Sequence, residues 1–401
     1  MSDAAALEAR QFAWRASALF AALFFSAGIQ MAYLPAWFAS RGLTPGEISL
    51  VLALPMVVRM ATTPGITYAA DLSGQQERII VWLTWGALGA VVALYFGHAF
   101  WPLLAAMIVH ASLWTAIMPL SEALAMRGVN RGGLDYGRMR SWGSVAFIAA
   151  GLVGGGVLGT FGAERIIILL MGSAVALVVV AHLIAGQTGD AAGANTQRAD
   201  MTWRDTLRLL TRQHFIFLFL ASGLGQASHA VYYAFATIYW QSIGIAPLAI
   251  GMLWAVGVAA EIGVFVISKR LIARFGAPLL LVVGIAAGVL RWPLTALEPP
   301  LVLLFVVQLL HGLTFGAVHL AAVHLIATLA GESRSATAQG VHNTFAAGLF
   351  MAGAIAGAGW LFAAYGGSAF FAMAALSALA LFAALAFTKR HAALGDVLPR
   401  N

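Results

Sequence analysis

Residues 166–185 read IIILLMGSAVALVVVAHLIA, a run of twenty residues without Asp, Glu, Lys or Arg. A helix needs about 20 such residues to cross the roughly 30 Å of hydrocarbon in a bilayer. Similar runs recur along the chain, which is 61% hydrophobic and only 9% charged, whereas an ordinary soluble domain carries about 25% charged residues. The sequence therefore predicts an all-α membrane protein.

The apolar runs, bounded by charged or turn-rich breaks, predict twelve transmembrane helices in two sets of six. The first set lies near 14–39, 46–70, 78–97, 101–126, 139–161 and 164–186, and the second near 213–241, 247–270, 277–297, 300–329, 334–364 and 367–388. Residues 186–200 are rich in small and polar residues, and a short amphipathic segment follows at 203–210. We therefore expect an N-terminal bundle (1–186), a cytoplasmic linker (187–212) and a C-terminal bundle (213–401).

Basic residues gather in alternate connections between the predicted helices. By the positive-inside rule, both termini are expected to be cytoplasmic and the protein to lie in a bacterial inner membrane. This distribution explains the net charge of +7 without a nucleic-acid partner. The opposite loops hold little beyond Arg41 and Arg165, while the basic connections contain Arg10, Arg15, Arg78, Arg127, Arg131, Arg138, Arg140, Arg198, Arg204, Arg208, Arg212, Lys269, Arg270, Arg274, Arg334, Lys389 and Arg390.

An internal repeat relates the two predicted bundles. Without gaps and at an offset of 202 residues, Gly42-Leu43-Thr44-Pro45 falls on Gly244-Ile245-Ala246-Pro247, and Gly74 falls on Gly276. Many transporters are built from two similar bundles that move about a central site. In the same frame Arg59 falls on Glu261, so we expect opposite charges at equivalent depths on two walls of one cavity.

Four ionisable side chains lie well inside predicted helices: Arg59, Glu122, Glu261 and Arg291. A charge at the bilayer centre costs roughly 2.5 to 3.5 kcal/mol, so such residues usually face a polar interior, find a partner and mark a pathway. We expect Arg59 and Arg291 to bind substrate, and Glu261 and Glu122 to couple transport to protons. Static ion pairs that only fix helix packing are the alternative.

Histidines and aromatic residues add candidate site groups. His311 and His319, about two turns apart on one face of a helix, are expected to line the cavity and to assist proton coupling. His110, His229 and His324 are expected only to make hydrogen bonds, and no metal site is expected. Tyr33, Tyr232, Trp114 and Trp254 are candidates for stacking on a ring-bearing substrate, and Trp37 and Trp240 are expected in the interfacial aromatic belts.

Two stretches carry a resemblance to a known family. Residues 119–125 (PLSEALA) and 134–144 (LDYGRMRSWGS) resemble the phenylpropionate permease family of the major facilitator superfamily. Asp71, Gly74 and Arg78 form a degraded version of the superfamily's Gly-x-x-x-Asp-Arg/Lys-x-Gly-Arg/Lys loop, in which Leu72 and Gln75 replace basic residues. We expect Asp71, Gly74, Asp135, Arg138 and Arg140 to act in cytoplasmic gating.

The resemblance implies a lactose-permease-like fold of two pseudo-symmetric six-helix bundles and a proton-coupled importer of an aromatic carboxylate such as 3-phenylpropionate. Glu122, Arg140, Glu261 and Arg291 occupy places comparable to acids and arginines that handle substrate and protons in lactose permease, as do the histidines of 300–329. That segment holds no carboxylate here, which departs from lactose permease.

The sequence thus predicts alternating access coupled to one proton, with Glu261 as the proton acceptor. Three other functions stay open: symport of a sugar, oligosaccharide or nucleoside, efflux, and a membrane-embedded enzyme or sensor. The last would need a nucleophile, a metal cluster or a soluble domain, none of which we find. We expect a monomer whose partners are substrate, protons and lipid, with no cofactor beyond the proton gradient.

Overall fold

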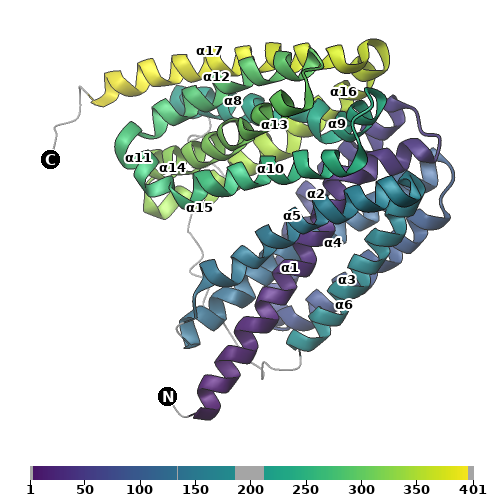
Figure 1. Ribbon diagram of the computed structural model, residues 1–401. Helices are drawn as coiled ribbons and strands as arrows, with labels where there is room; N and C mark the ends of the chain where they lie inside the picture. The colour runs from purple at the N-terminus through teal and green to yellow at the C-terminus, as the bar shows by residue number, and fades with distance from the viewer. Residues whose placement is uncertain (1–2, 133, 186–211, 396–401) are drawn as a thin grey trace. The chain divides into compact units, whose positions relative to one another are not determined.

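The computed structural model describes residues 3–132, 134–185 and 212–395, and every regular element in them is a helix (Figure 1). Contacts divide the chain into two units. Unit 1 comprises Met1–Asn195 with Trp240–Ala255, and unit 2 comprises Thr196–Tyr239 with Val256–Asn401. The predicted linker, apart from Arg212, and the amphipathic segment at 203–210 lie outside the described residues.

Among the described residues, eleven helical stretches are long and apolar enough to cross a membrane. The last of them, Ala338–His391, has 54 residues, which at 1.5 Å per residue would extend about 80 Å and exceed one bilayer crossing. A short 3₁₀-helix, η4 (Gly366–Ser368), interrupts it between α16 (Met351–Tyr365) and α17 (Ala369–Gly395). The predicted arrangement of twelve membrane helices is therefore confirmed.

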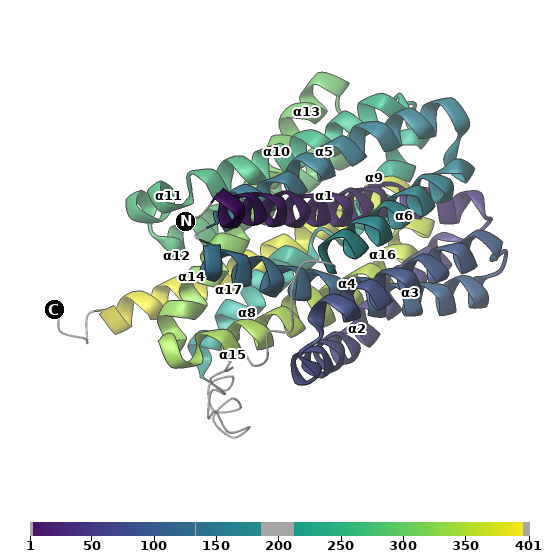
Figure 2. The same cartoon turned by 90° about the horizontal axis from the view of Figure 1, so that it is seen from below.

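Unit 1 contains the first six membrane helices, whose apolar faces meet in a shared core. α1 runs between α5 and α6 and contacts both (Figure 2), and α4 contacts α2 and α3. The core includes Phe20 of α1, Leu83 of α3 and Leu120 of α4. The elements are α1 (Asp3–Ser40), α2 (Pro45–Ser73), α3 (Gln76–Phe96), α4 (Phe100–Gly132), α5 (Tyr136–Phe161), η1 (Ala163–Arg165) and α6 (Ile166–Ala185).

Unit 2 packs α17 against α8 and α12, and α12 against α14. Its core includes Phe215, Leu281 and Phe387. Large apolar side chains such as Val266 and Phe382 point outward and are more than 70% exposed, as expected for a surface solvated by lipid. The remaining helices of the second half are α8 (Gln213–Ala227), α9 (Ala230–Ser242), α10 (Pro247–Val266), α11 (Ser268–Phe275), α12 (Ala277–Ala296), α13 (Leu301–Leu309), η2 (Gly312–Ala317), α14 (Val318–Ala330), α15 (Glu332–Asn343) and η3 (Thr344–Phe350).

Several of these helices are interrupted where the sequence predicts continuous ones. The helix expected at 213–241 breaks between α8 and α9, where the Ser228 hydroxyl donates to the carbonyl of Gly225 at 2.7 Å. Such a local side-chain bond competes with the helical ladder. The helices expected at 300–329 and 334–364 contain the π-helical segments η2 and η3, which hydrophobic periodicity does not reveal.

The internal repeat is visible in the backbone. α2 begins at Pro45 and α10 begins at Pro247, 202 residues later. The matched glycines have similar positive φ angles: 84° at Gly42 and 82° at Gly244, then 67° at Gly74 and 72° at Gly276. Only glycine adopts these φ angles without strain, so the repeat preserves a glycine with positive φ before and after the matched helices.

Trp37 and Trp240 do not lie in an interfacial belt, and this expectation is wrong. Both side chains are 0% exposed. Within unit 1, Trp240 contacts Trp254 with ring centroids 6.2 Å apart, and the guanidinium of Arg41 lies 5.1 Å from the Trp37 ring. Hydropathy cannot separate the two placements, because a protein interior and a membrane interface both accept an indole ring.

Candidate functional site

A polar cluster lies inside unit 2, around Arg291 of α12. This side chain is 0% exposed, although an arginine is almost never fully buried without partners. Its Nη2 donates to Gln308 Oε1 at 2.9 Å, and its Nη1 donates to Thr314 Oγ1 at 2.9 Å and to His311 Nδ1 at 3.0 Å. All three acceptors are neutral groups: Gln308 belongs to α13, Thr314 to η2, and His311 lies between these two elements, which contact α12 (Figure 1).

The hydrogen bonds of this cluster have a defined direction. A guanidinium only donates, so His311 accepts at Nδ1 and, when neutral, carries its proton on Nε2. On the other side, Thr314 accepts from Arg291 and lies 3.0 Å from His229 Nε2, while His229 Nδ1 donates to the carbonyl of Gln226 at 3.0 Å. A neutral His229 accepts at Nε2 from the hydroxyl of Thr314.

Glu261 of α10 lies at the open end of this chain of contacts. Its Oε2 is 3.8 Å from Nε2 of His311, the nitrogen that carries the proton. The exposed fraction of the Glu261 side chain is 22%, against 5% for His311 and 0% for Arg291. Polar groups thus run from a partly accessible carboxylate to a fully buried guanidinium.

Two features of the local sequence shape this end of the cluster: the first allows α10 to approach, and the second arranges the histidines. Gly312 faces Ala260, and a Cβ at Gly312 would approach the Ala260 carbonyl oxygen to 2.7 Å, so only glycine fits. The π-helix η2 separates His311 from His319, and π-helical turns occur frequently at functional sites. Within η2, the ring of Phe315 stacks on His311 and on His319, with ring centroids 5.4 Å and 6.1 Å apart. The two predicted histidines therefore lie on one face of the segment, with Phe315 between them.

Aromatic rings surround the guanidinium. The Arg291 Cζ atom lies 4.8 Å from the centroid of Tyr232 and 4.6 Å from that of Trp292, within the range of cation–π attraction. His229 stacks on Tyr233 with centroids 5.5 Å apart. Several polar atoms here are buried and have no hydrogen-bond partner among the described residues: Arg291 Nε, Gln308 Nε2, Gln226 Oε1 and the Tyr233 hydroxyl. Unsatisfied buried groups are rare in proteins and call for an explanation.

The predicted site residues of unit 1 are more dispersed. Arg59 lies half-buried in α2, and its guanidinium makes no hydrogen bond or ion pair with the described residues. Glu122 accepts a hydrogen bond from the Tyr136 hydroxyl at 3.3 Å. Thus, of the four charges predicted inside the membrane, each unit holds one cation and one anion.

The unit 1 aromatic candidates make packing contacts in this conformation. Tyr33 is fully buried, donates to the carbonyl of Gly151, and fills the space left by Gly154. Trp114 stacks near His110 at 6.4 Å, and its buried indole N–H has no hydrogen-bond partner among the described residues. Trp254 is 3% exposed. Their proposed stacking on substrate stays a prediction.

The predicted gating residues lie at helix ends. Asp135 caps the start of α5 by accepting from the backbone N–H of Arg138 at 3.1 Å. Gly74 ends α2 in the left-handed conformation, and Asp71 accepts from Gln76 at 2.6 Å. The guanidinium of Arg140 lies 3.8 Å from the Phe24 ring. These contacts define the turns, while a role in gating stays a prediction.

Sequence analysis missed Gln308 and Thr314, two direct partners of Arg291. Their spacing contains a signal: Gln308, His311 and Thr314 follow one another at intervals of three in an otherwise apolar segment, which places them near one helix face. His229, expected only to make hydrogen bonds, belongs to the same cluster. In the part of the chain that the structure describes, no three His, Asp or Glu side chains gather to hold a metal.

Comparisons with known proteins agree with this architecture. The model of the MFS_1-like family matches residues 13–386. The chain is 34% identical over 365 residues to the probable 3-phenylpropionic acid transporter of Escherichia coli (strain K12), covering 90% of this chain and 93% of the relative. It is 26% identical to the maltose permease of Geobacillus stearothermophilus over 77% of this chain and 76% of that protein.

Among solved structures, the nucleoside transporter NupG superposes with a TM-score of 0.82 at 16% sequence identity, covering 94% of this chain and 99% of that one. At this identity the likeness shows the fold alone. The family model and the 34% identical relative show family membership as well as the fold, since both matches extend over most of the chain. The chain is therefore a multi-pass secondary transporter that belongs to the MFS_1-like family of the major facilitator superfamily, in the same family as the probable 3-phenylpropionic acid transporter.

Proposed function

We propose that the chain imports an aromatic monocarboxylate together with a proton, by alternating access, with Glu261 as the proton acceptor. The observation that carries the proposal is the connected chain from Glu261 through His311 to Arg291 in unit 2. It combines a carboxylate, a histidine and a cation inside an apolar helix bundle, where isolated charges are costly.

The hydrogen-bond directions favour Glu261 over His311 as the proton carrier. To bind a second proton, His311 would have to give up the bond at Nδ1 and become a cation next to the Arg291 guanidinium. Glu261 faces neither obstacle, and its side chain is the more exposed of the two. His311 then orients the carboxylate, and Arg291 fixes the tautomer of His311.

Charge balance favours a carboxylate substrate. A substrate anion that approaches Glu261 repels its negative charge, so Glu261 takes up a proton more readily as substrate binds. Anion and proton together are neutral, which lets the loaded carrier reorient without moving net charge through hydrocarbon. We assign the substrate carboxylate to Arg59, with Arg291 as a second cation that keeps the site positive.

An aromatic substrate is favoured by the rings near Arg291 and by the relative whose printed name is probable 3-phenylpropionic acid transporter. Tyr232, Tyr33, Trp114 and Trp254 are our candidates for stacking on its ring. The charge distribution of the loops favours cytoplasmic termini in a bacterial inner membrane. Asp71, Gly74, Asp135, Arg138 and Arg140 then lie on the cytoplasmic side, where gating would act.

Symport of a sugar or a nucleoside is the second candidate, because a maltose permease is among the relatives. Counterflow in proteoliposomes separates the two. We expect exchange of labelled 3-phenylpropionate to be inhibited by other aromatic acids and unaffected by maltose or uridine. Inhibition by the sugar or the nucleoside, but not by the acids, would support symport of a sugar or a nucleoside instead.

Glu261→Gln tests the coupling. Glutamine keeps the size and polarity of the side chain but binds no proton, so the variant should lose uphill accumulation driven by a proton gradient and retain exchange at equal concentrations. Both are measured with radiolabelled 3-phenylpropionate in the same proteoliposomes. Glu8→Gln, at an exposed position near the start of α1, serves as the matched control. Undiminished accumulation in Glu261→Gln would refute the coupling role.

A further inference from the structure

Two pockets of unit 1 adjoin each other at Arg165 and Ile168. The larger, here called the apolar groove, has a volume of about 920 Å³ and lies among α1, α5 and α6. The smaller, here called the polar pocket, has a volume of about 320 Å³ and is lined by Ser40, Arg41, Tyr95, His98, Glu164, Arg165 and Ile168. Because Arg165 and Ile168 line both, we consider the two adjoining pockets together and call them the amphipathic site.

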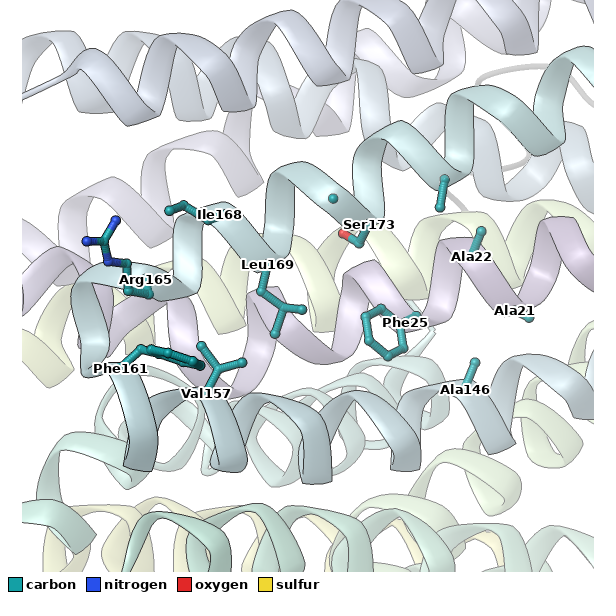
Figure 3. A pocket seen from close by; sticks show the side chains of 12 residues that line it. Ala21, Ala22, Phe25, Ala146, Val157, Phe161, Arg165, Ile168, Leu169 and Ser173 are labelled. Carbon is teal, nitrogen blue, oxygen red and sulfur yellow. The ribbon is translucent and has the colours of Figure 1, made fainter.

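The apolar groove is shaped by small and aliphatic side chains. Figure 3 shows Arg165 at one end and Ala21 and Ala146 toward the other, with Val157, Leu169 and Phe25 between them. Small residues of α1, α5 and α6 leave the groove open, and Gly172 is one of them: a Cβ there would meet no atom within 4 Å. Arg165 is the charged residue of its lining. This shape and chemistry suit a hydrocarbon chain.

The polar pocket presents two cations and one anion. Arg41 is held in place by Nη1 donating to His98 Nδ1 and Nη2 donating to the Tyr95 carbonyl, each at 3.1 Å. Its buried Nε has no hydrogen-bond partner among the described residues. Arg165 and Glu164 are both exposed at the end of the apolar groove. Arginine pairs well with phosphate, and the carboxylate of Glu164 complements an ammonium group.

We propose that this amphipathic site binds one molecule of phosphatidylethanolamine. One acyl chain lies in the apolar groove, the phosphate contacts Arg165 and Arg41, and the headgroup amine contacts Glu164. Two cations and one carboxylate match a headgroup that has a phosphate and an ammonium, whereas a headgroup with a phosphate alone would leave Glu164 opposed to its charge. With cytoplasmic termini, this lipid belongs to the outer leaflet of the inner membrane. The lipid site contains none of the proposed transport residues, so it can be tested independently of the proposed function.

Native mass spectrometry of the detergent-purified full chain tests the proposal, with added phosphatidylethanolamine or phosphatidylglycerol of the same acyl chains. The wild type should retain one phosphatidylethanolamine at high occupancy. Gly172→Leu adds a side chain to the lining of the apolar groove, at a position where a Cβ meets no atom within 4 Å, and Arg165→Gln removes a phosphate ligand. Each should lower that occupancy at least fivefold. The matched control is Gly89→Leu, at an exposed helical glycine of α3 that also faces open space.

Glu164→Gln identifies the headgroup. It should lower retention of phosphatidylethanolamine and raise that of phosphatidylglycerol until the two are equal, because the carboxylate that selects the amine is gone. Equal occupancy in the wild type, Gly172→Leu and Arg165→Gln would overturn the site. Stronger wild-type retention of phosphatidylglycerol would overturn the assigned headgroup. Thermal unfolding of each variant confirms that a loss of lipid does not reflect a loss of fold.

Discussion

Arg59 in α2 and Glu261 in α10 occupy the same position of the internal repeat, yet their surroundings differ. Both helices begin at a proline and are followed, 202 residues apart, by matched glycines with positive φ. Glu261 lies at the end of a connected chain that includes His311 and Arg291. Arg59 makes no hydrogen bond or ion pair with the residues that the structure describes.

The difference indicates a division of labour on a shared scaffold. The neighbours of Glu261 are ordered by fixed hydrogen bonds, and they keep its carboxylate in one place. Such a carboxylate is suited to take up and release a proton. A cation inside a membrane helix is costly unless it meets water, an anion or a substrate, so Arg59 is suited to a partner that arrives and leaves. In the proposed mechanism, the same backbone position serves proton coupling in one half and substrate recognition in the other.

The largest expected effect tests whether the connected contacts of Glu261, His311 and Arg291 depend on the shape of the guanidinium. Arg291→Lys keeps the charge but cannot supply two nitrogens to three acceptors in a fixed fork. We expect uptake of 3-phenylpropionate to fall at least about 100-fold, and stability to fall by roughly 1 to 3 kcal/mol as buried acceptors lose their donor. Proteoliposome uptake and thermal unfolding measure both. Arg270→Lys, exposed in α11, is the control, and half-maximal or better uptake by Arg291→Lys would contradict the assignment.

A smaller effect is expected on the Arg59 side of the comparison. Losing one charged hydrogen bond to the substrate costs roughly 1.5 to 3 kcal/mol, so Arg59→Gln should raise KM about 10- to 100-fold. Accumulation at saturating substrate should persist, in contrast to Glu261→Gln. Counterflow over a range of concentrations gives KM, and steady-state accumulation gives coupling. An unchanged KM with lost accumulation would reverse the two roles.

The smallest expected effect is a difference in stability between substitutions at the two matched glycines that follow the repeated helices. Gly74 has φ 67° and ψ 2°, in the left-handed helical region, whereas Gly276 has φ 72° and ψ 152°, a region open almost only to glycine. Neither Cβ would meet an atom closer than 3.7 Å, so only backbone strain distinguishes them. Gly74→Ala should cost about 1 kcal/mol and Gly276→Ala about 2 to 3 kcal/mol. Equal shifts in thermal unfolding would show that the turns are equivalent.

The fold was predictable because membrane helices can be recognised in a sequence by their apolar composition and length. Length of apolar runs, alternation of basic loops and the 202-residue repeat lead to the two sets of six helices. The breaks at Ser228 and in η2 were not predictable in this way, since they depend on a local hydroxyl bond and on a change of helical turn. Hydropathy treats both segments as uniform.

The candidate site was predictable only in part. Glu261, Arg291 and His311 stand out because a titratable group in an apolar helix is costly, and unit 2 brings these three together. Gln308 and Thr314 are uncharged and cost less to bury, so they attract attention only when their spacing around His311 is considered. Burial of Trp37 and Trp240 was missed because an indole suits both a core and an interface.

The π-helix η2 makes the segment from α13 to α14 unequally tolerant of deletions. Each hydrogen-bonded ring of a π-helix contains one residue more than that of an α-helix. Loss of one residue within Gly312–Ala317 can be absorbed by tightening that turn, whereas loss of one residue within Val318–Ala330 turns everything that follows it by about 100°. Length variation within the α13–α14 segment of related chains should therefore concentrate at η2, next to His311.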